Sequence, residues 1–159
     1  MNDLNCDKIK KLIKEKFPIA IDISRFVPTF LIGGALRDTL EGKVPNDLDF
    51  VVLDKSDEII KFFIDSFELK YKINKLGGYK IFYNDIVIDL WNTCDLFNAI
   101  QYNIEGLFYD VNSDYFLPFG YYDALKNGLR EINPSNNIQY NEKKLTRKLK
   151  LEDYIKNHN

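Results

Sequence analysis

The order of elements in this chain is set by residues 30–52, which read FLIGGALRDTLEGKVPNDLDFVV. A β-prone run over 29–32 leads into a Gly-Gly pair at 33–34, and a helix-like segment follows at once. A loop over 41–46 contains the helix breakers glycine and proline. The apolar run over 48–53 then predicts a buried strand, so the stretch predicts a strand–helix–strand unit.

The glycine pair at the start of the helix is a candidate phosphate site. Gly33 and Gly34 allow the backbone to approach a phosphate closely, and the start of a helix directs free N–H groups toward an anion. Arg37, one turn into the helix, adds a charge-assisted fork for a phosphate. A Gly-Gly pair is also typical of an ordinary tight turn, so the pair does not decide between these interpretations.

Three aspartates favour the phosphate interpretation. Asp47 and Asp49 are two residues apart at the start of a strand, so their carboxylates project to the same face. Asp89 shares a strand face with Val87 and Trp91, opposite an apolar face. Close carboxylates repel each other unless a cation lies between them, and hard oxygen ligands suit Mg²⁺. The alternative is that all three are solvated residues at strand ends or at a sheet edge.

Together these residues suit two-metal phosphoryl transfer. We expect Asp47, Asp49 and Asp89 to be the metal ligands and the catalytic residues, with two Mg²⁺ ions, or Mn²⁺ in their place. A metal lowers the pKa of an acceptor hydroxyl, so no histidine base is needed. The single histidine of the chain, His158, is its penultimate residue.

Elsewhere the sequence predicts a mixture of helices and strands. Residues 84–85, Asn-Asp, separate two alternating apolar runs and predict a hairpin. We expect an α/β (α+β) fold, with a mixed, mostly antiparallel sheet of about five strands flanked by helices. Helical patterns over 1–17 and 141–156 predict flanking helices, and we interpret the basic residues of the second as a solvated face, with its leucines Leu145, Leu149 and Leu151 turned inward.

Composition limits the function classes. The 159 residues carry 22 Lys and Arg against 24 Asp and Glu, a net charge of -2, which excludes a polycation that grips nucleic acid by charge alone. Two cysteines match neither a disulfide framework nor a zinc site. No apolar run reaches the length of a membrane span, and no signal peptide is evident, so we expect a cytoplasmic protein with no membrane partner.

The motif GGALRD at 33–38, followed by PNDLD at 45–49, resembles the head domain of poly(A) polymerases and CCA-adding tRNA nucleotidyltransferases. These belong to the DNA polymerase β-like nucleotidyltransferase superfamily. PFGYYDALKNGLR at 118–130 resembles a further segment of the family, so the likeness runs over about 30–130. It implies one nucleotidyltransferase head-like domain over 1–159, without the neck, body and tail of the family.

The resemblance also implies roles for the candidate residues. Gly33, Gly34 and Arg37 would bind the nucleotide, and Asp47 and Asp49 would hold the metals, with Asp89 a weaker third. The chain departs from the family at 99–105, AIQYNIE, where two arginines and an aspartate implicated in sugar and triphosphate recognition are absent.

The function expected from this reasoning is Mg²⁺-dependent transfer of a nucleoside monophosphate from an NTP, ATP or CTP, to an acceptor hydroxyl, with release of pyrophosphate. The acceptor stays open between an RNA 3′ end such as that of tRNA, a small molecule and a protein side chain. The alternative is a nucleotide-binding or partner-binding module of the same fold with little or no turnover.

Overall fold

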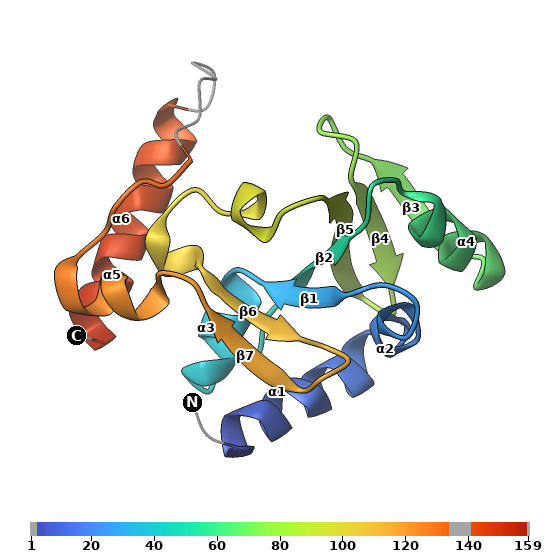
Figure 1. Ribbon diagram of the computed structural model, residues 1–159, viewed down its shortest axis with the longest axis horizontal. Helices are drawn as coiled ribbons and strands as arrows, with labels where there is room; N and C mark the ends of the chain where they lie inside the picture. Colours follow the sequence, from blue (N-terminus) through green and yellow to red (C-terminus); the bar gives the residue numbers. More distant parts are fainter. Residues whose placement is uncertain (1–2, 134–140, 159) are drawn as a thin grey trace.

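A computed structural model describes residues 3–133 and 141–158. These residues form one seven-stranded sheet in the order β3-β4-β5-β2-β1-β6-β7, with helices around it (Figure 1). The strands are β1 (Thr29–Ile32), β2 (Asp47–Leu53), β3 (Lys70–Ile73), β4 (Tyr79–Tyr83), β5 (Ile86–Thr93), β6 (Leu107–Asp110) and β7 (Tyr115–Pro118). The helices are α1 (Asp3–Lys16), α2 (Ile19–Ser24), α3 (Gly34–Leu40), α4 (Glu58–Ser66), α5 (Tyr121–Asn127) and α6 (Asn141–His158), with 3₁₀ turns η1 (Leu96–Ala99) and η2 (Asn103–Glu105).

The predicted fold class is confirmed, but the sheet is larger than the five or so strands expected. Every neighbouring pair is antiparallel except β2 and β5, which run parallel. The strand that was not expected from the sequence is β3, KYKI, which is exposed at all four positions. Its residues alternate between lysine and an apolar side chain, but only over four positions, which is a weak signal for a strand.

The predicted hairpin joins β4 to β5. Tyr83 pairs with Ile86, and the two turn residues Asn84 and Asp85 have φ angles of 44° and 67°. Positive φ at both central positions is the geometry of a type I′ turn, whose twist matches that of the flanking strands. The hairpin places β5 beside β2, which β5 then joins in parallel.

Alternate residues of the strands face two different cores. One face carries Leu31, Phe50 and Ile88 and packs in the main core with residues of α1 to α4. The other carries Phe30, Val51 and Phe108 and packs in a smaller core against Ile100 and residues of η1, with Trp91 at its margin. The alternation of β2 directs Asp47 and Asp49 to the face with the smaller core.

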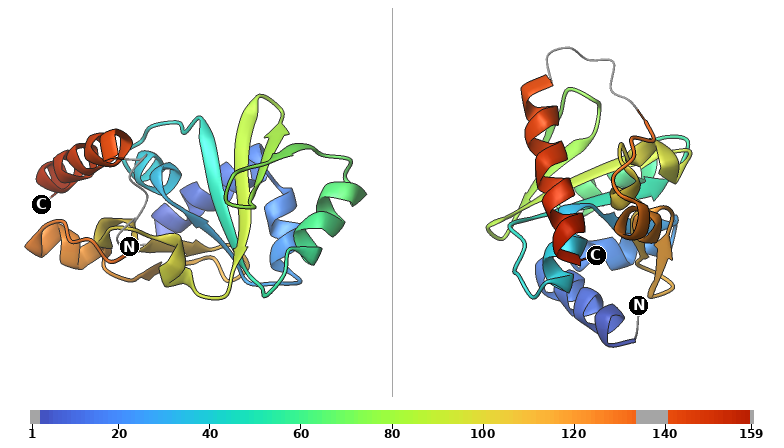
Figure 2. Two further views of the ribbon diagram at one scale, coloured as in Figure 1. Left: turned by 90° about the horizontal axis from the view of Figure 1, so that it is seen from above. Right: turned by 90° about the vertical axis from the view of Figure 1, so that its left-hand side faces the viewer.

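Helix α6 lies beside α5 at one end of the molecule, and α4 lies at the other end (Figures 1 and 2). Leu151 and Ile155 of α6 are buried in the main core, and the Tyr154 hydroxyl is 2.7 Å from that of Tyr121 on α5. The inward-facing leucine stripe expected on this helix is wrong in part, because Leu145 and Leu149 are exposed. No helix of the described residues is long and apolar enough to cross a membrane.

Candidate functional site

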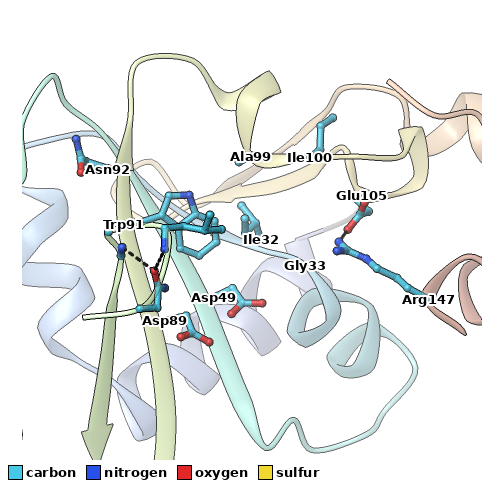
Figure 3. Close-up of a pocket in the computed structure, with 14 residues that line it drawn as sticks. Ile32, Gly33, Asp49, Asp89, Trp91, Asn92, Ala99, Ile100, Glu105 and Arg147 are labelled. Atoms are coloured by element: carbon cyan, nitrogen blue, oxygen red, sulfur yellow. Dashed lines mark hydrogen bonds and ion pairs between the residues drawn. The ribbon is translucent and has the colours of Figure 1, made fainter. Parts of the chain in front are cut away.

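Asp49 and Asp89 are neighbours on the sheet. They occupy directly paired positions of the parallel strands β2 and β5, and both line the same cavity (Figure 3). Asp47 lies two residues earlier on the same face of β2 and is exposed at the start of the strand. The structure therefore brings two of the three predicted carboxylates into a close pair and leaves the third at the rim.

The pair has the electrostatics of crowded acids. Burial raises the pKa of Asp49 to about 7, and the neighbouring Asp89 and then Asp47 add to the rise. Two carboxylates side by side disfavour ionisation of both unless a cation lies between them. Such a pair of hard oxygen donors fits Mg²⁺.

The cluster is smaller than the one expected from the sequence. Over residues 3–133 and 141–158, no three or more His, Cys, Asp and Glu side chains are grouped so that they could hold a metal ion. The donor set that fits a metal is thus the Asp49–Asp89 pair, and the addition of Asp47 stays a prediction.

Gly33 connects β1 to α3 and lies next to Asp49. Its φ is 79°, which side chains rarely allow, and a Cβ there would lie 3.1 Å from Oδ2 of Asp49. Ile32, the residue before it, pairs with Asp49 across the sheet. The glycine therefore lets the backbone and the Asp49 carboxylate approach closely, and its contact with a phosphate stays a prediction. Gly34 begins α3 and does not line the cavity.

The cavity beside the carboxylates has a volume of about 440 Å³. One end is acidic, with Asp49 and Asp89, and another part is apolar, with Trp91 and Ile100. The loop between β3 and β4 contributes part of the wall. Asn74 orders this loop, because its Oδ1 accepts hydrogen bonds from the N–H groups of Leu76 and Gly78, both at 2.9 Å.

Arg37 is not among the residues that line the cavity. Its guanidinium lies 5.9 Å from the centre of the Tyr154 ring on α6, and burial lowers its pKa. Nη2 of Arg37 lies 3.9 Å from the point that a Cβ on Gly34 would occupy. The guanidinium is therefore close to the Gly33-Gly34 turn, the predicted phosphate site. Its role in nucleotide binding stays a prediction.

A second arginine reaches the cavity from α6. Arg147 donates a hydrogen bond to Oε2 of Glu105, and both residues line the cavity wall (Figure 3). Sequence reasoning placed Arg147 on a solvated face. Its side chain is indeed 51% exposed, but it also lines the cavity, which was not expected. No sequence signal separates it from the lysines around it, since its place depends on how α6 packs on α5 and the sheet.

Comparison with known proteins gives a clear result for the fold alone. No family model matches the chain, and no curated protein sequence matches it. Solved structures do: a Thermotoga maritima CCA-adding enzyme complexed with tRNA superposes with a TM-score of 0.64 at 21% identity over 91% of this chain. The chain has the fold of CCA-adding nucleotidyltransferases. A tRNA-processing enzyme in an apo form gives 0.60 at 19% identity over 93% of the chain, and a tRNA-processing enzyme with CTP gives 0.58 at 21% over 90%.

The nucleotidyltransferase fold confirms the likeness expected from GGALRD and PNDLD. The matched regions span 40% of the first of these enzymes, 43% of the second and 40% of the third. One feature of the site was not expected from the sequence: the Arg147–Glu105 pair in the cavity wall.

Proposed function

We propose that this chain is a metal-dependent nucleotidyltransferase that binds an NTP in the cavity beside Asp49 and Asp89. The observation that carries the proposal is the pairing of these two aspartates across parallel strands, at the edge of a cavity whose wall includes the Gly33 turn. Nucleotidyltransferase fold neighbours complexed with ATP, CTP and tRNA support the same class of ligand.

The chain's own residues would divide the work as follows. Asp49 and Asp89, with Asp47 at the rim, would hold Mg²⁺, which when bound polarises the phosphate and lowers the pKa of the acceptor hydroxyl. The backbone at Gly33 allows the phosphates to lie close to these carboxylates. The apolar part of the cavity, at Trp91 and Ile100, offers a surface for the base or for the acceptor.

In the reaction the acceptor oxygen forms a bond to the α-phosphorus of the NTP. The bond from that phosphorus to the oxygen bridging to the β-phosphate breaks, pyrophosphate leaves, and the hydroxyl proton passes to water. The acceptor is an RNA 3′ end such as that of a tRNA, a small molecule or a protein side chain.

One observation favours a second candidate, a nucleotide-binding module with little or no turnover. Ala99 and Ile100 present apolar side chains to the cavity, where the related family is expected to carry arginines. A site that lacks those cations would bind a triphosphate but stabilise less of the charge that develops during transfer.

A labelling assay distinguishes the two. Purified protein is incubated with Mg²⁺ or Mn²⁺, α-³²P-labelled ATP or CTP, and in separate reactions total tRNA, a small-molecule extract or cell protein. We expect label in one acceptor class and its loss in Asp49→Asn and Asp89→Asn. Asp65→Asn, an exposed aspartate on α4, is the matched control and should label as the wild type does.

Binding measured beside transfer decides the outcome. NTP binding without transfer to any acceptor would favour the binding module. Transfer that persists in both aspartate variants would contradict the assignment of the site. Calorimetry with Mg²⁺ and a non-hydrolysable NTP reports on the same two variants without turnover.

A further inference from the structure

We propose that Arg147 of α6 is a phosphate-binding residue of this site, and that Glu105 holds its guanidinium in the cavity wall for an incoming triphosphate. The inference rests on the proposed function and adds to it the source of positive charge in the site. At Ala99 and Ile100 the family that the sequence resembles has arginines, whereas this chain has apolar side chains that line the cavity.

Glu105 is built into the wall of the cavity. It is 4% exposed, and its Oε1 accepts hydrogen bonds from the N–H groups of Gln101 at 3.2 Å and Tyr102 at 3.0 Å. These bonds fix the 3₁₀ turn η2 through one oxygen. The other oxygen, Oε2, accepts from Nη2 of Arg147. The carboxylate therefore has one oxygen for the backbone and one to orient the arginine.

Arg147 keeps donors for a ligand while it is oriented. Its side chain is 51% exposed, against 5% for that of Glu105, so the contact with Glu105 leaves much of the arginine accessible. A guanidinium has five N–H donors in a planar fork that matches a phosphate in two-point contact. The hydrogen bond to Glu105 is made by Nη2, and Arg147 lines the same cavity as Gly33 and Asp49. We therefore expect the other donors of the fork to serve a ligand in that cavity.

The charges around the cavity are consistent with this role. Arg147, Asp49 and Asp89 line the same cavity, so one positive side chain and two acidic ones are presented to a ligand there. A nucleoside triphosphate with its metal ion carries charges of both signs: phosphate oxygens would contact the guanidinium, and a bound cation would relieve the repulsion of the carboxylates.

Arg147 belongs to α6, which is far along the chain from residues 99–100. The position of Arg147 in the cavity wall therefore depends on how α6 packs on the rest of the protein. Leu151 and Ile155 bury α6 against the main core, and the Tyr121–Tyr154 contact joins it to α5. The structure therefore offers a different route to a cation at the phosphates: one arginine brought in by a packed helix in place of residues on the 99–105 segment.

The test is the dependence of affinity on the number of phosphates. Dissociation constants for ATP, ADP, AMP and adenosine, and for the cytidine series, are measured by calorimetry with Mg²⁺ on the wild type, Arg147→Ala and Arg147→Lys. We expect Arg147→Ala to weaken triphosphate binding about 10- to 100-fold, the effect of one lost hydrogen-bonded ion contact. AMP and adenosine should change by less than about twofold, because they lack the β- and γ-phosphates, and Lys should restore part of the loss.

Two further variants make the result decisive. Arg147→Ala leaves a buried carboxylate unpaired, so the double variant with Glu105→Gln, which keeps an oxygen for the two backbone N–H groups, is measured as well and should lose the same triphosphate affinity. Lys150→Ala removes an exposed charge from the same helix and should bind as the wild type does. Undiminished triphosphate binding by both Arg147 variants would overturn this inference alone. A wild-type protein that binds no nucleotide would instead overturn the proposed function.

Discussion

Asp49 of β2 and Asp89 of β5 face each other across the one parallel strand pair of the described sheet. Their proximity and the burial of Asp49 raise its pKa from 3.8 to about 7. Holding the two acids together therefore lowers the free energy of unfolding, by an amount that depends on pH.

Asp49→Asn should stabilise the metal-free protein in alkaline solution. Below about pH 3 the carboxyl is protonated in both folded and unfolded chains. As the pH rises toward 7 the unfolded chain loses the proton first, so the folded state loses relative stability, and above 7 the full cost is present. Because Asp49 is partly accessible to solvent, we expect a gain of about 2 kcal/mol near pH 8 and almost none near pH 3. Urea unfolding in EDTA at both pH values measures it, and a gain that is equal at the two would contradict the pair.

Gly33→Ala tests the close approach of the turn to the carboxylate. Gly33 and Gly42 have nearly the same positive φ, 79° and 81°, but a Cβ at Gly42 would meet nothing within 4 Å. Both alanine variants should lose about 1–2 kcal/mol from backbone strain. Gly33→Ala should lose about 1 kcal/mol more and shift the Asp49 carboxyl titration seen by ¹³C NMR, while Gly42→Ala leaves that titration in place. Identical behaviour of the two variants would show that the contact does not matter.

Asn103→Ala should destabilise the wall that carries Glu105. Asn103 is fully buried; its Nδ2 donates to Asp123 at 3.1 Å and to the carbonyl of Gly128 at 3.0 Å, and its Oδ1 accepts from the N–H groups of Ile104 and Arg130. Loss of these bonds should cost about 3 kcal/mol in the free energy of unfolding. Asn127→Ala removes an exposed bond to the same aspartate and should cost less than about 0.5 kcal/mol.

The docking of α6 is tested by two leucines on that helix. Leu151 is 4% exposed and Leu149 is 54% exposed. Leu151→Ala should cost about 2–4 kcal/mol through the cavity it leaves, whereas Leu149→Ala should be nearly neutral. Thermal and urea unfolding compare the two. Equal effects would mean that α6 does not pack as described, and would weaken the assignment of Arg147 with it.

The sequence predicted the fold where the signals are local. The strand–glycine–helix–strand order of 30–52 and the Asn84-Asp85 hairpin each depend on neighbouring residues, so pattern reasoning found them. The exposed edge strand β3 alternates over only four residues, too few to identify it. The parallel pairing of β2 with β5 was not specified either, because it joins segments separated by a helix and two other strands.

The candidate site divides in the same way. Asp47, Asp49 and Gly33 belong to one contiguous motif, and strand alternation identified the face of Asp89. The Arg147–Glu105 pair joins a helix to a distant turn, and its two members resemble many other charged residues in the chain. Arg37 belongs to the contiguous motif and was singled out from the sequence. The motif did not predict that its guanidinium packs near Tyr154 of α6.

The crossover between β2 and β5 has a consequence for folding. Asp49 and Asp89 are separated along the chain by α4, β3 and β4, and closure of such a long connection is an entropic cost borne before any contact across it is made. The carboxylate pair is therefore completed only as the sheet closes, and partly folded chains carry no binding site. Any ligand of the pair binds the native state alone, so it would add about 2.7 kcal/mol of stability at a concentration 100 times its dissociation constant. A rise in melting temperature on addition of a ligand would therefore report binding to the folded sheet and not to partly folded chains.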